Sequence, residues 1–152
     1  NFHTNPESLN HHNVINDTIP EYFWEKYKNN KEELKKREKY IAKSSGYSFK
    51  YAKKTSRPFP AGEEAISKDP DYAYWYAEDV LAAPFPAGEL AISKDAFYAF
   101  WYARRVLNGP FPTGEAAIAE DGEFSHRYAK DVLKADFYID GKLIAKFKNE
   151  PI

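Results

Sequence analysis

The chain has 152 residues and a net charge of −1, and 43% of its residues are hydrophobic and 17% aromatic, a composition that excludes a disordered chain. The absence of cysteine excludes disulfides, thiolate nucleophiles and cysteine-ligated zinc. No apolar run approaches the roughly 18 residues that a membrane-spanning helix needs, so we expect no membrane partner.

Residues 1–18 are rich in asparagine and show no helical periodicity, so they are predicted to form a flexible arm. His3, His11 and His12 lie in this arm and could hold a metal only weakly. We therefore predict no metal site, and no motif indicates another cofactor. Because the chain lacks methionine and begins with Asn1, we expect it to have been excised or processed from a longer protein.

Residues 19–57 are predicted to contain the N-terminal helices and a degenerate first repeat. Pro20 suits the first turn of a short aromatic helix, and Asn30 followed by Glu33 is the signature of a capping box that begins a charged helix. The basic cluster of this region comprises Lys35, Lys36, Arg37, Lys39 and Lys43. It is either a contact for an acidic partner or phosphates, or simply a solvated helix face or polar cap.

Three segments with a period of 26 residues align without gaps across residues 58–135. They read PFPAGEEAISKDPDYAYWYAEDVLAA, PFPAGELAISKDAFYAFWYARRVLNG and PFPTGEAAIAEDGEFSHRYAKDVLKA. A degenerate copy precedes them from Arg37 and is one residue short before Pro58, and a fifth copy is indicated at Phe137 before the pattern diverges. A repeat of this length is typical of stacked supersecondary units.

Each copy is predicted to fold as two helices. A proline and a glutamate in the first turn mark a short first helix, because proline fits that turn and glutamate favours the positive end of the helix dipole. These glutamates are Glu63, Glu89 and Glu115. An aspartate N-cap then begins a second helix of about three turns. The N-caps are Asp69, Asp95 and Asp121, and the last residues are Leu81, Leu107 and Leu133.

The apolar arc of each second helix covers about 200° of the helical wheel, which is too broad for packing against a single neighbour. One unit cannot bury this arc alone, so the copies must stack. The sequence therefore predicts an all-α fold, a short α-solenoid of about four two-helix repeats with an N-terminal helical cap. For residues 136–152 the Asp-Gly pair favours a small hairpin or irregular cap, although a loose alignment with a first helix leaves a helix open.

One ladder on the polar side of the second helix combines aromatic and cationic residues in register. It comprises Lys50, Trp75, Trp101 and Arg127. In one interpretation each tryptophan packs on the first helix of an adjacent unit, and the end units are exposed and therefore cationic. In the other, the ladder is a partner-binding stripe, because tryptophan and arginine anchor interfaces.

A second ladder alternates in charge from copy to copy. It comprises Lys54, Asp79, Arg105 and Asp131. If second helices lie side by side, these charges are expected to pair between units and help to set the register. Such exposed pairs contribute on the order of 0–1 kcal/mol each.

The sequence contains no constellation typical of catalysis. It lacks a phosphate-binding glycine loop, a nucleophile turn and a helical metal motif. The repeated glutamates are one unit apart in equivalent environments, whereas acid–base catalysis needs two carboxylates with separated pKa values. We therefore predict a protein that is not an enzyme.

The unit FPxGExAIxxDxxYAYxYAxxVL resembles short tandem repeats of uncharacterised bacteriophage and prophage proteins. The matching residues extend from Phe59-Pro60 to Val80-Leu81 in the first copy, and the resemblance covers residues 58–135. It implies a viral origin, a bacterial cytoplasmic location and a role in binding a host component, but no activity that could be transferred.

Three functions fit these observations. The first is a protein-binding repeat module that modulates or inhibits a host protein. The second is a nucleic-acid-binding protein that uses the basic N-terminal helix and the Trp/Lys/Arg stripe, although residues 59–152 carry 10 basic and 16 acidic residues, and this acidic balance argues against it. The third is a structural virion component. The sequence does not set the oligomeric state.

Overall fold

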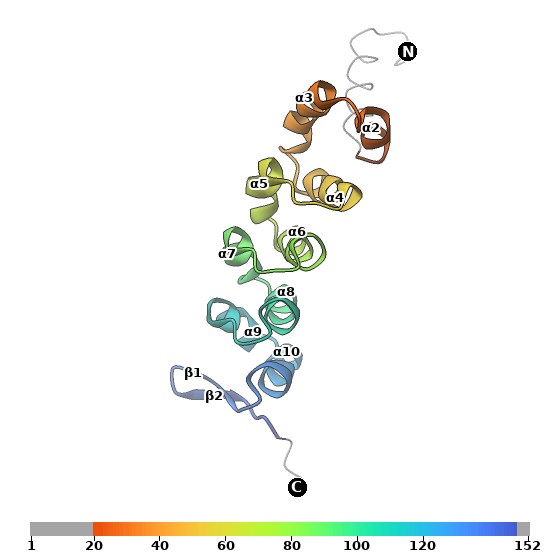
Figure 1. Ribbon diagram of the computed structural model, residues 1–152. Helices are drawn as coiled ribbons and strands as arrows, with labels where there is room; N and C mark the ends of the chain where they lie inside the picture. Colours follow the sequence, from red (N-terminus) through yellow and green to blue (C-terminus); the bar gives the residue numbers. More distant parts are fainter. Residues whose placement is uncertain (1–19, 149–152) are drawn as a thin grey trace, which may run out of the picture. The chain divides into compact units, whose positions relative to one another are not determined.

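The computed structural model describes residues 20–148, which are mostly helical and end in a two-stranded antiparallel sheet (Figure 1). The predicted arm of residues 1–18 and its three histidines lie outside the described residues. The chain divides after Ile66 into two compact units, and each unit is described by itself.

The first unit contains the predicted N-terminal helices and the degenerate repeat. Its elements are α2 (Pro20–Tyr27), α3 (Lys31–Ile41), α4 (Ser45–Thr55), the 3-10 turn η2 (Pro60–Gly62) and the start of α5 (Glu63–Ser67). The core residues of this unit include Phe23, Leu34, Ile41, Tyr51 and Phe59. Aromatic rings join its elements, since the Tyr51 ring lies 5.1 Å from Phe23 and 4.8 Å from Phe59.

The capping box at the start of α3 is half formed. The Asn30 side chain accepts a hydrogen bond from the Glu33 backbone N–H at 3.2 Å, as predicted. In a complete capping box the Glu33 carboxylate would accept from the Asn30 backbone N–H. Here that N–H donates instead to the Tyr27 carbonyl at 2.8 Å. The Glu33 carboxylate is then available for Lys36 and Arg37 on the same helix.

The helix spacing of the second unit agrees with the predicted two-helix repeats. Its α-helical segments are α6 (Pro70–Trp75), α7 (Glu89–Ile92), α8 (Ala96–Trp101), α9 (Glu115–Ala119) and α10 (Gly122–Arg127). The 3-10 turns η4 (Pro86–Gly88) and η6 (Pro112–Gly114) precede α7 and α9. The second helices α6, α8 and α10 pack in series, while α7 covers α6 and α9 covers α8 (Figure 1).

Each second helix of this unit changes from α to π geometry halfway along. The π segments are η3 (Tyr76–Leu81), η5 (Tyr102–Leu107) and η7 (Tyr128–Leu133). They end at the predicted residues, whereas their π geometry was not predicted. The π geometry arises because these copies have one more residue between their caps than α4 has. The N-cap and the left-handed C-cap are residues 69 and 82 in the first copy, and residues 44 and 56 around α4. A π segment absorbs that additional residue without shifting the caps.

In the second and third copies, a buried tyrosine joins the two helices of the repeat. The Tyr102 hydroxyl donates to the Glu89 carboxylate at 2.6 Å and accepts from the Phe85 backbone N–H at 2.9 Å. Tyr128 makes the same two bonds with Glu115 and Phe111, and these bonds have the same lengths. The glutamates do lie in the first helical turn, where they were expected for the dipole, but they are also acceptors for a buried hydroxyl.

Replacement of this tyrosine by phenylalanine tests how much the bridge contributes. Tyr102→Phe leaves the Phe85 N–H without its acceptor inside a buried site, so we expect the free energy of unfolding to fall by about 1–3 kcal/mol. Urea unfolding followed by circular dichroism measures this loss. Tyr138→Phe is the control, because the Tyr138 ring is 52% exposed. Equal stability of the two variants would show that the bridge contributes little.

A hairpin follows the last repeat, as the Asp-Gly signal predicted. The strands β1 (Phe137–Ile139) and β2 (Lys142–Ala145) are joined by Asp140 and Gly141, which have φ angles of 49° and 80°. Phe137 is fully buried against Tyr128 at a ring distance of 4.9 Å, close to the 5.1 Å between Tyr102 and Phe111. The fifth copy therefore keeps its first aromatic contact before the chain turns into strands.

Candidate functional site

The second helices place the tryptophan ladder at the junction between their α and π parts. Trp75, Trp101 and Arg127 are the last residues of α6, α8 and α10, three helices that pack in series. Lys50 is an exposed residue of α4 and belongs to the other unit. Three of the four predicted partner-binding residues are thus brought onto neighbouring helices, and their role in binding stays a prediction.

An open hollow lies between α6 and α8, and we name it the aromatic hollow. It has a volume of about 230 Å³ and is lined by Tyr74, Trp75, Phe97, Trp101 and Arg105. Trp75 is 37% exposed and Phe97 is 44% exposed, which is high for such large apolar side chains. Aromatic side chains held on packed helices can bind a partner at a small cost in conformational entropy.

Trp101 lies between two arginines. The Arg105 guanidinium lies 4.6 Å from the centre of its ring, and that of Arg127 lies 4.9 Å away. Its neighbouring rings, Phe97 and Phe100, belong to its own helix. Cation–π contacts of this kind contribute about 0.5–1 kcal/mol at exposed sites. All these contacts of Trp101 come from second helices.

The charge that joins adjacent repeats differs from the predicted ladder by one position. Arg105 forms an ion pair with Glu78 at 3.2 Å, whereas Asp79 or Asp131 was expected as its partner. Glu78 also faces the buried Tyr74, whose pKa is raised by burial and by this carboxylate. A π segment advances the backbone by a different angle per residue than an α-helix, and the helical wheel did not include this change.

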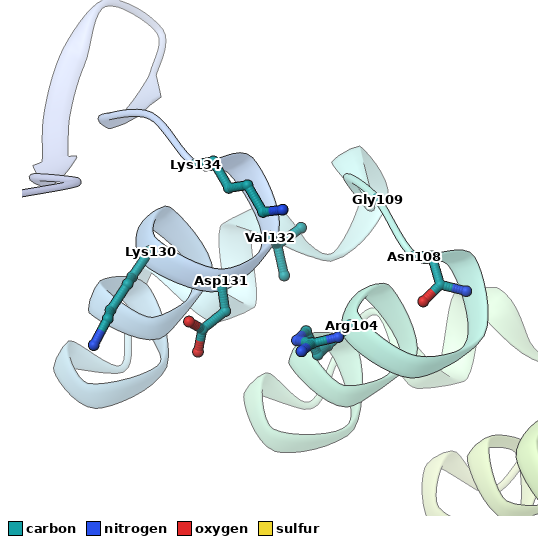
Figure 2. Close-up of a pocket in the computed structure, with 7 residues that line it drawn as sticks. All are labelled: Arg104, Asn108, Gly109, Lys130, Asp131, Val132 and Lys134. Carbon is teal, nitrogen blue, oxygen red and sulfur yellow. The ribbon is translucent and has the colours of Figure 1, made fainter.

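A second hollow, named here the basic hollow, lies between the ends of η5 and η7 (Figure 2). It has a volume of about 420 Å³, and its lining comprises Arg104, Asn108, Gly109, Lys130, Asp131, Val132 and Lys134. Figure 2 shows Lys134 reaching toward Val132, Asp131 between Lys130 and Arg104, and Lys130 directed away. Within the part of the chain that the structure describes, Arg104, Lys130 and Lys134 have no acidic partner within 4.0 Å.

A middle hollow of about 340 Å³ connects the other two. Its lining comprises Phe100, Trp101, Arg104, Arg105, Arg127 and Asp131. It shares Trp101 and Arg105 with the aromatic hollow, and Arg104 and Asp131 with the basic hollow. The three hollows therefore form one continuous surface across α6, α8 and α10, aromatic at one end and basic at the other.

The predicted basic cluster on α3 and just after it is only partly available to a partner. Arg37 pairs with Glu33, donates to the Tyr27 hydroxyl at 3.1 Å and stacks 4.0 Å from the Tyr27 ring. Lys36 also pairs with Glu33, and Lys43 lies 5.7 Å from the centre of the Tyr40 ring. The remaining members, Lys35 and Lys39, are exposed on the helix. The contacts of Arg37 with Tyr27 show that Arg37 takes part in the packing between α2 and α3.

Sequence reasoning did not find Phe97, Arg104, Lys130 or Lys134. A comparison of the copies position by position contains the signal. Phe97 stands where the other copies have Asp71 and Glu123, and Arg104 stands where the first copy has Glu78. Some positions that are identical in all copies are core positions, such as Phe59, Phe85 and Phe111 or Tyr76, Tyr102 and Tyr128. Phe97 and Arg104, which line hollows, stand at positions that differ between the copies.

Comparison of the chain with known protein families, with curated proteins and with solved structures finds no match in any of the three. Among residues 20–148, no helix is long and apolar enough to cross a membrane. The same residues contain no group of three or more histidines or acidic residues that could hold a metal ion. The functional proposal therefore rests on the residues that line the three hollows.

Proposed function

We propose that this chain is a non-enzymatic protein-binding module, built as a short α-solenoid that stacks two-helix repeats. The observation that supports it best is the aromatic hollow, where Trp75, Phe97 and Trp101 stand partly exposed on helices fixed by a buried core. Exposed tryptophans beside arginines have the composition of interface hot spots. A monomer gains nothing from leaving these rings in water, so a partner that covers them would account for their positions.

The phage resemblance supports a more specific form of this proposal. In that form the chain is a phage-encoded modulator or inhibitor of a host protein and acts in the bacterial cytoplasm. The chemistry needed for it is recognition alone, which agrees with a site made of aromatic rings and cations. A structural role in a virion is the alternative in which the partner is another particle protein or a second copy of the chain.

Replacement of both tryptophans by alanine tests the proposal. In a pull-down from a nuclease-treated bacterial lysate, wild-type protein should retain a specific protein, and Trp75→Ala/Trp101→Ala should weaken that binding at least about 100-fold. The variant should keep its helical circular dichroism, because the buried core residues are unchanged. Tyr138→Ala is a matched control, an exposed aromatic residue outside the hollows.

Phe97→Glu provides a second test that preserves the repeat. The third copy has Glu123 at this position, so the backbone already accommodates glutamate there. The variant should fold normally but lose the partner, because a carboxylate would be placed in the aromatic hollow. Binding that is unchanged in both variants would reject this surface as the site. Binding that disappears with nuclease would instead favour the nucleic-acid function, for which the cations around Trp101 are the supporting observation.

A further inference from the structure

We infer that the occupant of this surface is an acidic peptide segment of a partner protein, with one large apolar side chain beside its acidic residues. The apolar side chain would enter the aromatic hollow, and the carboxylates would lie along the middle and basic hollows. This inference rests on the proposed function and adds the chemistry of the partner.

The aromatic hollow has the size and lining for a single side chain. Its volume of about 230 Å³ lies below the range of about 300–1,000 Å³ that is typical of pockets for whole small molecules. Tyr74, Trp75, Phe97 and Trp101 supply aromatic walls, and Arg105 at the rim is already paired with Glu78. An aromatic or large aliphatic anchor therefore fits this end, whereas a charged group would lose its hydration without gaining a partner.

The other two hollows carry an excess of positive charge that the chain itself does not neutralise. Their cations are Arg104, Arg105, Arg127, Lys130 and Lys134, and their only lining carboxylate among the described residues is Asp131. Arg105 and Arg127 have acidic partners, Glu78 at 3.2 Å and Glu123 at 3.9 Å. The other three cations have none within 4.0 Å.

This local charge is unusual for the chain. The net charge is −1, and the corresponding π segment of the first copy carries Glu78 and Asp79 where η5 carries Arg104 and Arg105. Like charges gathered on one surface repel each other, and a ligand with several carboxylates would relieve that repulsion. The difference between copies thus favours recognition of an anionic segment.

A peptide fits the charge distribution better than a nucleic acid does. A single strand carries a phosphate at every nucleotide, including those whose bases would stack in the aromatic hollow. That end of the surface carries carboxylates: Asp71 lies one helical turn before Trp75, and Glu78 pairs with Arg105. A peptide can place an uncharged residue there and confine its acidic residues to the basic end.

Selection from a display library of random dodecapeptides on the full chain tests the inference. The expected result is a set of peptides with an aromatic or large aliphatic residue and a cluster of Asp and Glu to one side of it. A synthetic copy of one selected peptide, labelled with a fluorophore, then serves as the probe in anisotropy titrations. A labelled oligothymidylate of equal length serves as the nucleic-acid probe.

Substitutions that introduce residues from the other copies test whether the acidic residues of the peptide bind at the basic hollow. Arg104→Glu/Lys134→Asn introduces the residues that other copies have at these positions, Glu78 and Asn108, so the fold should tolerate both changes. We expect this variant to weaken peptide binding at least about tenfold and to reduce its dependence on salt. Lys142→Glu/Lys146→Asn changes the net charge by the same amount at exposed residues outside the hollows and should leave the affinity unchanged.

The outcomes separate this inference from the proposed function. Selected peptides without acidic enrichment that still lose binding with Trp75→Ala/Trp101→Ala would overturn the inference and leave the proposed function in place. Equal loss of affinity in the two charge variants would also overturn it, because the effect would then be one of net charge. If oligothymidylate binds and no peptide is selected, both the inference and the proposed function are overturned in favour of nucleic-acid binding.

Discussion

Above pH 10 the free energy of unfolding should fall steeply, because several buried tyrosines must keep their protons while the chain is folded. These tyrosines are Tyr51, Tyr74, Tyr102 and Tyr128. Burial raises the pKa of each above its ordinary value of 10.0, and a neighbouring glutamate raises it further. The unfolded chain loses these protons near pH 10, so above that pH the folded state binds more protons and stability declines.

The expected slope follows from proton linkage. Below pH 10 the tyrosines are protonated in both states, so the stabilisation is fully present and does not change with pH. Each tyrosine that stays protonated only in the folded state then lowers the stability by about 1.4 kcal/mol per pH unit. The free energy of unfolding of a domain is usually about 5–15 kcal/mol. Four such residues would remove most of it over a rise of about one to three pH units above pH 10.

Urea unfolding measured from about pH 8 to about pH 11 tests this expectation. Tyr102→Phe should be less stable than wild type at neutral pH, but its stability should fall less steeply above pH 10, by about 1.4 kcal/mol per pH unit. All other titratable groups are the same in the two proteins, so the comparison isolates Tyr102. Tyr138→Phe, at an exposed position, should keep the wild-type slope. Identical slopes for all three proteins would contradict the assignment.

Gly114→Ala should lower the free energy of unfolding by about 1–3 kcal/mol through overpacking. A Cβ added at Gly114 would lie 2.6 Å from Cδ2 of Phe111 and 2.9 Å from Cβ of Ala99, distances that real contacts essentially never show. Both neighbours are buried, so neither can move into solvent. The backbone at Gly114 has a φ of −92°, which any residue adopts, so the expected loss comes from crowding against the Phe111 ring of the same turn and Ala99 of the preceding second helix.

Gly122→Ala is the matched control for this prediction. Gly122 is the first residue of α10, and a Cβ added there would meet nothing within 4 Å. Alanine restricts the unfolded chain more than glycine does, so we expect this variant to gain about 0.4–1 kcal/mol. Thermal unfolding should therefore shift in opposite directions for the two variants. A shift in the same direction for both would show that the space at Gly114 does not limit how closely the first helix approaches Ala99.

The same comparison between copies explains why this fold can carry a binding surface. Gly88 approaches Ala73 as Gly114 approaches Ala99, so each first helix is set on the preceding second helix by small residues. That packing uses one side of the second helix. The opposite side is free to vary from copy to copy, and its differences produce a surface that is aromatic at one end and basic at the other.

Several features followed from the sequence because their signals are local. The N-caps Asp95 and Asp121 accept from backbone N–H groups three residues later at 3.0 Å, as their positions before the second helices predicted. The Asp140-Gly141 pair predicted the hairpin because it allows two consecutive left-handed residues. The period of 26 residues predicted helices of matching length and order. The cap and turn signals depend on neighbours within a few positions along the chain, and the period is visible directly in the alignment of the copies.

Other features depend on which side chains meet across helices, and only the tertiary structure decided them. The tyrosine bridge joins residues 13 positions apart, such as Tyr102 and Glu89, and its spacing resembles no local motif. The π geometry of η3, η5 and η7 follows from an additional residue between two fixed caps, and it changes which charges face each other. Arg105 therefore pairs with Glu78 rather than Asp79.

The candidate site shows the same division between sequence and tertiary structure. The sequence by itself determined that Trp75, Trp101 and Arg127 share one register position, because a repeat places equivalent residues on equivalent faces. It did not determine that Arg105 and Arg127 lie on either side of Trp101, or that Arg104 and Lys134 line one hollow. Those contacts depend on the distance and angle between successive second helices, which are set by the packing of the buried tyrosines, glycines and alanines throughout the stack.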